Sequence, residues 1–438
     1  MPHELDQILI SSSQPDFKDK LGKLRLAIMK TAAFEVGDPR YSQIRDIIEG
    51  VRKRGDEAVA EYTYKFDQVD LTPEQFQVPK EELQKAHSEI NRDLLKSIRQ
   101  AIENVRKYQK EIFVGSSKNC SGGTGIKYTP IKRIGICVPG ASAPLPSTVI
   151  MTAVPAQVAG VKEMAVVSPP RYKGTIHPVI LAVCCELGID EVYRIGGAQA
   201  VAALAFGDRK SGRIKVDKIV GPGNTWVQMA KREVFGVVDI DSIAGPSEVL
   251  IIANDKATPA WVAADMLSQA EHDPGSAMLF TLSQELAEEV LLELKTQVKQ
   301  LDREKETVEC LKQFSCIIVF ENMNKLIEKA NDFAPEHLQI QCGKESRAIA
   351  DKIENAGAIF IGDYSPVAVG DYWAGPSHTL PTGQTARFFS ALSTNDFIKS
   401  TSIIEYDKKK LAESADDIIR LAEAEGLDAH AKSIKIRQ

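Results

Sequence analysis

The sequence has few aromatic residues, no long apolar run and no excess of positive charge. Aromatic residues make up 6% of its 438 residues, and 60 acidic side chains against 54 basic ones give a formal net charge of −6. No basic excess exists to neutralise nucleic-acid phosphates or an anionic membrane, so neither is expected as a partner. The most apolar stretch, 149–161, is interrupted by Thr152, Pro155 and Gln157 and is too short to span a bilayer.

Features of secreted proteins are also missing. The first residues, MPHELDQILISSS, contain neither a basic start nor an apolar core, so we expect no signal peptide. The seven cysteines include no CxxC pair, and Cys184 and Cys185 are adjacent within a helical pattern. We interpret the cysteines as reduced thiols and expect a cytoplasmic protein.

The composition that remains is that of a globular protein, with 43% hydrophobic and 26% charged residues. The length suggests about two to four domains. Helical patterns cover 41–66 and 80–112, and the chain turns helical again after about 393.

Between these helical regions, short apolar segments alternate with helical patterns. The first series of expected strands covers 131–138, 163–167, 191–195, 215–220 and 237–240. The second series covers 249–253, 277–282, 316–320 and 358–361, with helices at 258–271, 284–300, 322–333 and 345–355. Strands that alternate with helices imply right-handed crossovers, so we predict an α/β fold with two units, each built on a parallel sheet.

Glycine-rich turns follow several of the expected strands. They are Val138-Pro-Gly-Ala141, Gly196-Gly-Ala-Gln199, Gly221-Pro-Gly-Asn224 and Gly245-Pro-Ser-Glu248. Neither GxGxxG nor a P-loop is present, and each turn alone could be a plain strand-to-helix connection. Because ligands of open parallel sheets bind outside the carboxyl ends of the strands, four such turns favour a nucleotide or cofactor.

Histidine is scarce, with seven in the chain, and four of the histidines have a polar neighbour. The pairs are Gln269 with His272, Glu336 with His337, Asp371 with His378, and Glu425 with His430. Imidazole, carboxylate and amide groups together could hold a borderline cation such as zinc. Each pair could equally be a helix, turn or cap residue, so chemistry alone leaves a metal-dependent α/β enzyme and purely structural roles both open.

From about residue 34 to the C-terminus the sequence resembles the histidinol dehydrogenases. The matching blocks are Arg54–Ala58, Gly196–Ala200, Lys218–Asn224, Ala244–Glu248, Leu267–His272, Ala334–Leu338, Gly370–Tyr372 with His378–Pro381, and Glu425–His430. The resemblance implies two incomplete Rossmann-like parallel-sheet domains with small N- and C-terminal helical segments.

The resemblance also implies a domain layout. The expected parts are a small segment 1–33, a first large α/β domain 34–136 and 247–392, a second large α/β domain 137–246 and a helical domain 393–438. Most of the zinc and catalytic site is expected in the first large domain and NAD on the side of the second. The C-terminal domain is expected to reach the partner subunit.

In function, the resemblance implies a zinc-dependent enzyme that oxidises L-histidinol to L-histidine with NAD, in two steps through bound L-histidinaldehyde. This reaction is the last step of histidine biosynthesis. The family forms a homodimer whose active site is shared between the subunits.

The family's site residues carry over onto matching positions. Zinc would be held by Gln269, His272, Asp371 and His430 of the partner subunit, and Glu336 with His337 would form the catalytic pair. Ser247, His378 and Glu425 would bind the substrate together with the zinc ligands and His337, and NAD would contact Gln199, Asn224 and position 137.

One block departs from the family pattern. The family has a Tyr before its Pro-Gly-Gly turn, where Cys137 stands here, and Ala141 replaces the second Gly. A contact to NAD is lost with the Tyr, so we expect weaker cofactor binding. The first 33 residues also match poorly.

Other functions remain open. A related zinc- and NAD-dependent dehydrogenase of another small alcohol, such as a sulfonated diol, need not retain Ser247, His378 and Glu425. Intact Glu336 and His337 disfavour a non-catalytic metal- or nucleotide-binding protein. A zinc hydrolase would leave the glycine-rich turns without a use.

Overall fold

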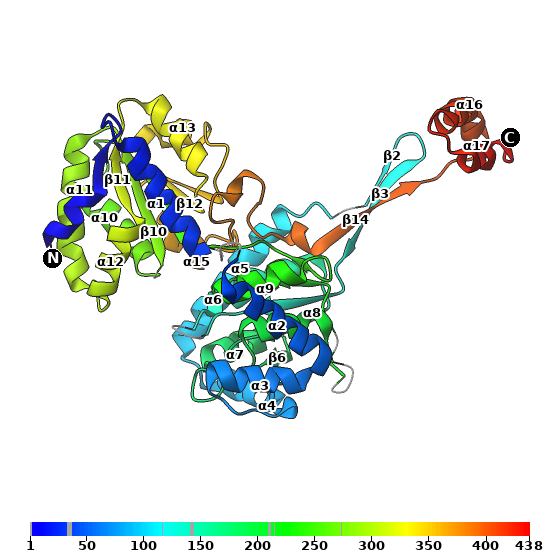
Figure 1. The fold of residues 1–438 in the computed structure, drawn as a ribbon, viewed down its shortest axis with the longest axis horizontal. Helices are drawn as coiled ribbons and strands as arrows, with labels where there is room; N and C mark the ends of the chain where they lie inside the picture. The colour runs from blue at the N-terminus through cyan, green and yellow to red at the C-terminus, as the bar shows by residue number, and fades with distance from the viewer. Residues whose placement is uncertain are drawn as a thin grey trace. The chain divides into compact units, whose positions relative to one another are not determined.

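A computed structural model describes most of the chain. The described residues are 2–32, 37–115, 117–140, 144–208, 212–213, 215–272 and 274–438. The chain divides into a larger unit, Met1–Phe113 with Ile131–Asp396, and a smaller unit, Val114–Pro130 with Phe397–Gln438. Two parallel sheets form the larger unit, which confirms the predicted α/β fold (Figure 1).

The first sheet has five parallel strands in the order β6-β5-β4-β7-β8. Its strands are β4 (Arg133–Cys137), β5 (Glu163–Val167), β6 (Glu191–Tyr193), β7 (Lys218–Val220) and β8 (Asp239–Ile240). The helices between them are α6 (Pro146–Ala159), α7 (Pro178–Glu186), α8 (Gly197–Phe206) and α9 (Thr225–Val234). Counted along the chain the order is 3-2-1-4-5, as in half of a Rossmann fold, and the order reverses between β4 and β7.

The apolar stretch 149–161 is explained by this packing. It supplies most of α6, in which every side chain from Thr148 to Ala156 is buried. A helix that is apolar all round belongs in a protein core, as α6 does. No helix in the described ranges has the length and apolar character that a membrane span requires.

Four helices that precede this sheet in the chain pack against the helices of the five-stranded unit. They are α2 (Pro39–Arg54), α3 (Asp56–Asp67), α4 (Lys80–Glu89) and α5 (Arg92–Glu111). Helices α2 and α3 share one buried core with α8, while α4 contacts α7 and α5 contacts α6. Shared packing therefore groups 39–111 with the five-stranded sheet, whereas the sequence-based layout grouped these residues with 247–392.

Both long helical patterns are interrupted. The expected helix 41–66 breaks at Gly55, whose φ of 64° lies in the left-handed region that glycine tolerates. The expected helix 80–112 ends after Glu89, and Asn91 starts a new helix because its side chain accepts from the Asp93 and Leu94 N–H groups.

The second sheet has six parallel strands in the order β1-β11-β10-β9-β12-β13. They are β1 (Leu9–Ser11), β9 (Ser247–Ala253), β10 (Gly275–Thr281), β11 (Cys316–Val319), β12 (His337–Gln341) and β13 (Ala358–Ile361). Helices α10 (Pro259–Ala270), α11 (Gln284–Gln297) and α12 (Glu304–Phe314) cover one face, and α1 (Phe17–Ala32), α13 (Met323–Phe333) and α14 (Ser346–Ala350) cover the other (Figure 1). A short helix, α15 (Val367–Tyr372), follows β13.

Two strands of this sheet and one helix that packs on it were not expected from the sequence. Strand β12 is fully buried, β1 adds the N-terminal segment to the edge beside β11, and α12 lies between two expected elements. Without β1, the strand order along the chain is again 3-2-1-4-5.

The smaller unit is not purely helical. Strands β2 (Lys118–Cys120), β3 (Thr124–Pro130) and β14 (Ile398–Ile404) form an antiparallel sheet in the order β14-β3-β2. Helices α16 (Lys408–Ala424) and α17 (Asp428–Lys435) follow and bury Ile419, Ala422 and Ala431 between them. The expected helical character after 393 therefore begins only at Lys408.

Candidate functional site

A cavity of about 830 Å³ lies at the carboxyl ends of the five-stranded sheet. It will be called the turn cavity, because residues of three predicted turns line it: Val138–Gly140, Gly196–Gln199 and Pro222–Asn224. Ala141 lies outside the described residues. The fourth turn, Gly245–Glu248, leads from β8 into β9. Three residues that flank helices of the six-stranded sheet also line the cavity: Glu271, His272 and Arg303.

The three proposed NAD contacts all line the turn cavity. Gln199 is 1% exposed, and both polar atoms of its amide lack a hydrogen-bond partner among the described residues. A buried amide without partners requires an explanation, and a polar ligand in the cavity would supply one. Asn224 caps α9, because its Oδ1 accepts from Val227 N at 3.2 Å. Burial raises the pKa of the Cys137 thiol to about 12, so this thiol stays neutral.

The proposed catalytic pair lies at the amino end of β12, in the six-stranded sheet. Glu336 immediately precedes this strand and is followed by His337, its first residue. Glu336 Oε2 accepts from Ser247 Oγ at 2.6 Å and from Glu248 N at 2.8 Å. His337 Nδ1 lies 2.9 Å from the Glu248 carbonyl oxygen and 3.4 Å from Glu336 Oε2.

These contacts fix the direction of the His337 ring. The Glu248 carbonyl can only accept, so Nδ1 carries a proton, and in the neutral form of the ring we assign its single proton to Nδ1. His337 Nε2 is buried, has no hydrogen-bond partner in the described ranges, and lies 3.8 Å from Asp371 Oδ1. The nitrogen available to a ligand is therefore Nε2.

Opposite charges hold the pair together. Burial alone would lower the pKa of His337, but the adjacent Glu336, together with Asp371 and the Glu248 carbonyl, outweighs burial and raises it to about 9. Burial would likewise raise the pKa of Glu336, yet His337 and the hydrogen bonds from Ser247 and Glu248 keep it below its ordinary value. At neutral pH the two side chains form an ion pair in the ligand-free protein.

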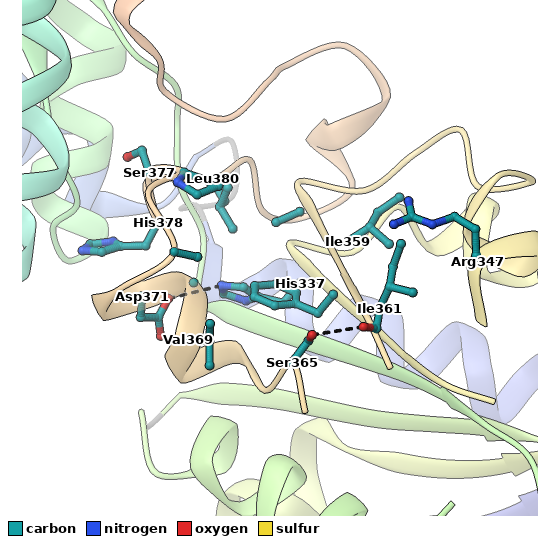
Figure 2. A pocket seen from close by; sticks show the side chains of 15 residues that line it. His337, Arg347, Ile359, Ile361, Ser365, Val369, Asp371, Ser377, His378 and Leu380 are labelled. Atoms are coloured by element: carbon teal, nitrogen blue, oxygen red, sulfur yellow. Dashed lines mark hydrogen bonds and ion pairs between the residues drawn. The ribbon is translucent and has the colours of Figure 1, made fainter. Parts of the chain in front are cut away.

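A second cavity, of about 400 Å³, will be called the histidine cavity. Its polar end is formed by His337, Asp371 and His378, and it extends along β13 to Arg347 (Figure 2). Figure 2 shows Asp371 of α15 beside the His337 ring. Burial raises the pKa of Asp371, although the charges of His337, His378 and His272 act in the opposite direction. Burial lowers the pKa of His378, whose Nε2 also lacks a hydrogen-bond partner among the described residues.

The proposed zinc ligands are brought together only in part. Gln269 is 2% exposed near the end of α10, and its Nε2 has no partner in the described structure. His272 follows three residues later and acts electrostatically on Asp371. Within the described ranges, no group of three or more His, Cys, Asp or Glu is arranged to hold a metal ion. His430 and Glu425 are exposed and belong to the smaller unit.

Sequence reasoning missed the role of the Glu248 side chain. This residue is 1% exposed, its Oε1 accepts from Gly383 N at 2.8 Å, and its Oε2 has no partner among the described residues. Burial, followed by repulsion from Glu336, raises the pKa of Glu248 to about 8. Its place in the Gly245–Glu248 turn was the available signal, but only the fold reveals that the carboxyl is buried beside another carboxyl.

Two parallel sheets with this strand order define a Rossmann-like α/β protein. The sequence profile of histidinol dehydrogenase matches residues 35–438. The chain is 46% identical over 399 residues to histidinol dehydrogenase of Heliobacterium mobile, covering 90% of this chain and 93% of that protein. It is 46% identical over 421 residues to the Bacillus subtilis (strain 168) protein of the same name, covering 95% and 97%.

A solved structure agrees. The crystal structure of histidinol dehydrogenase from Elizabethkingia anophelis superposes with a TM-score of 0.88 at 34% identity, covering 98% of this chain and 97% of that one. The chain belongs to the histidinol dehydrogenase family, as the sequence blocks predicted.

Proposed function

We propose that the protein oxidises L-histidinol to L-histidine with two molecules of NAD, as the last step of histidine biosynthesis. The observation that carries the proposal is the ion pair of Glu336 and His337. Glu336 accepts a hydrogen bond from Ser247, and His337 lines the histidine cavity together with Asp371 and His378. Family membership supplies the reaction, and this arrangement supplies groups that can move its protons.

In the first oxidation, His337 Nε2 is assigned the proton of the substrate hydroxyl as hydride leaves the carbinol carbon. NAD, when bound, accepts that hydride. Because the pKa of His337 is about 9 in the ligand-free protein, its neutral form must first be favoured. A further positive charge that enters the cavity with the substrate would favour it by repulsion.

In the second oxidation, water adds to the aldehyde carbonyl to give a hydrate, which then loses the second hydride. We assign the activation of this water to Glu336 Oε1, since Ser247 and Glu248 already contact Oε2. His337 then accepts a proton from the hydrate. One site can therefore serve both oxidations.

The donor set suits zinc, but it is incomplete within one described chain. Gln269 is buried, and its amide Nε2 has no partner among the described residues. Its amide oxygen, the carboxylate of Asp371 and the imidazole of His272, which acts electrostatically on Asp371, offer the mixed nitrogen and oxygen ligands that zinc accepts. Bound zinc would orient the imidazole and amino groups of histidinol. We assign the fourth ligand to His430 from a second copy of the chain and infer a homodimer with a shared site. The seven cysteines, all within the described ranges, form no disulfide, which supports a cytoplasmic location.

A stoichiometric assay tests this function. Purified protein with excess NAD should form two NADH per L-histidinol consumed, with L-histidine as the product. A chelator should abolish turnover, and added zinc should restore it. One NADH per substrate, or turnover of a sulfonated diol in place of histidinol, would contradict the proposal.

A further inference from the structure

A buried ion pair lies behind the turn cavity. Lys231 of α9 and Asp241, which follows β8, form an ion pair between Nζ and Oδ1. Their side chains are 1% and 4% exposed. Removing both charges from water is costly, and an apolar pair of similar volume often stabilises a protein as well or better. A gain in folding stability therefore does not explain why this ion pair is present, and its other contacts indicate a different role.

The pair holds both backbone polar groups of Gly221. Lys231 Nζ donates to the Gly221 carbonyl oxygen at 3.0 Å, and Asp241 Oδ2 accepts from Gly221 N at 2.7 Å. Asp241 Oδ1 also accepts from Ser242 N at 2.7 Å. One lysine and one aspartate thus fix the peptide groups on either side of a single glycine.

Gly221 cannot be replaced at this place in the backbone. Its φ is 107°, and an added Cβ would lie 2.3 Å from the carbonyl oxygen of Cys137. Cys137 ends β4 and Gly221 directly follows β7, so the contact spans the two strands between which the strand order reverses. Cofactors of Rossmann-like sheets bind at this reversal.

The residues after Gly221 are those that line the turn cavity. Pro222, Gly223 and Asn224 form its wall, and Asn224 begins α9, the helix that carries Lys231 two turns later. The position of this wall is therefore set from behind by the helix that it starts and by the residue that follows β8. A turn without such support would have to be ordered by the cofactor itself, at a cost in affinity.

We propose that Lys231 and Asp241 are positioning residues for the cofactor, which hold the Gly221–Asn224 turn in the conformation that NAD binds. This inference rests on the proposed NAD-dependent function. The pair touches no reacting atom and acts through the backbone of Gly221.

The double variant K231M/D241N tests the proposal, because it removes both charges without leaving one of them unpaired. The amide oxygen that replaces the Asp241 carboxylate can still accept from Gly221 N, whereas the Gly221 carbonyl loses its charged donor. The dissociation constant of NAD, measured by calorimetric titration, should rise by about tenfold or more, as expected when a hydrogen bond to a charged group is lost. The KM for NAD should rise in parallel, while the KM for histidinol, the zinc content and kcat at saturating NAD stay within about threefold of wild type.

The matched control is R133M. Arg133 is also a buried cation of the five-stranded sheet, with 5% of its side chain exposed, but it pairs with Glu191 and Glu163 at the amino ends of the strands, opposite the cavity. R133M should lower the melting temperature and leave the affinity for NAD unchanged.

The outcomes separate the two proposals. A folded K231M/D241N that binds NAD within about twofold of wild type, or an R133M that weakens NAD to the same degree, overturns the positioning role. If the double variant does not fold, K231Q/D241N is measured in its place, because it also removes both charges together with the charged donor to the Gly221 carbonyl, and a rise in the NAD constant is again expected. If wild type binds NAD but does not oxidise histidinol, the proposed function fails while the titrations still decide the role of the pair.

Discussion

Apart from β1, the two parallel sheets have the same strand order, but their candidate sites lie at opposite ends of the strands. In the five-stranded sheet, the carboxyl ends of the strands open into the turn cavity. In the six-stranded sheet, Ser247 and His337 are the first residues of β9 and β12, so the proposed chemistry lies at the amino ends. At the carboxyl ends of the same two strands, Asn254 bonds to the Gln341 and Cys342 carbonyl oxygens at 3.4 Å each. The same order of the five shared strands therefore brings the two candidate sites to opposite ends of the strands in the two sheets.

The largest effect is expected from a test of whether the proposed site at the amino ends of β9 and β12 is complete within one chain. His272→Ala and His430→Ala should each nearly abolish turnover, because each lesion removes a proposed zinc ligand from both sites of a homodimer. Mixed and refolded in equal amounts, the two variants should recover roughly a quarter of wild-type activity, since half of the dimers are mixed and each has one intact site.

Subunit exchange is verified by differently tagged chains. If His430 acted within its own chain, every site would carry one lesion whatever the pairing. Absence of recovery after verified exchange would therefore reject the shared site.

The second prediction separates the two oxidations proposed at the amino ends of β9 and β12. Glu336→Gln should slow the oxidation of histidinaldehyde by about 100-fold or more, the usual effect of removing a general base, and should slow histidinol oxidation far less. The half-reactions are measured with each substrate in single-turnover experiments. Glu345→Gln, beyond the carboxyl end of the same strand, is the matched control and should leave both rates unchanged. Equal losses in the two half-reactions would refute the assigned role.

The third prediction concerns the turn cavity, at the carboxyl ends of the strands in the five-stranded sheet. Cys137→Tyr should lower the KM for NAD by a few-fold, because a ring at this position can lie along the cofactor, and should leave the KM for histidinol nearly unchanged. Cys137 is only 6% exposed although it lines the cavity, so the ring must enter the cavity to make that contact. An unchanged or higher KM would mean that the surrounding backbone has adapted to cysteine.

The smallest expected effect is on stability and comes from Glu248. Its pKa is about 8 in the folded protein against an ordinary value of 4.5. Between these pH values the unfolded chain loses a proton that the folded protein retains, so folding stability falls as pH rises, by roughly 1.4 kcal/mol per pKa unit at most. Below both values the group has no effect.

Glu248→Gln cannot titrate at this position. Its melting temperature relative to wild type should therefore increase from about pH 5 to about pH 8 and then level off, by a few degrees in all. Thermal unfolding at several pH values measures it. A difference that does not vary with pH would contradict the buried neutral carboxyl.

The predictable part of the fold is the part that local pattern specifies. Alternating apolar strands and helices marked nine strand positions that the two parallel sheets occupy, and the glycine-rich turns pointed to the turn cavity. The missed strand β12 has the sequence His-Leu-Gln-Ile-Gln, in which polar residues alternate with apolar ones although all five are buried. Gln339 and Gln341 are accommodated because their amides bond to Asp265 of α10 at 3.0 and 2.7 Å, a partner remote in sequence. The antiparallel sheet of the smaller unit was missed for the same reason, since β3 pairs with β14 across more than half of the chain.

By itself, the sequence determined the α/β class, the glycine-rich turns and, through its motif blocks, the family. These are properties of short segments, in which hydrophobic spacing or a few fixed residues suffice. The tertiary structure alone decided that Ser247 and Glu248, 89 and 88 residues before Glu336, contact its carboxylate, and that the ion pair of Lys231 and Asp241 bonds to the backbone of Gly221. Those contacts depend on parallel strand pairing and on burial, which no local pattern encodes, because desolvation and charge pairing act between residues that only the fold brings together.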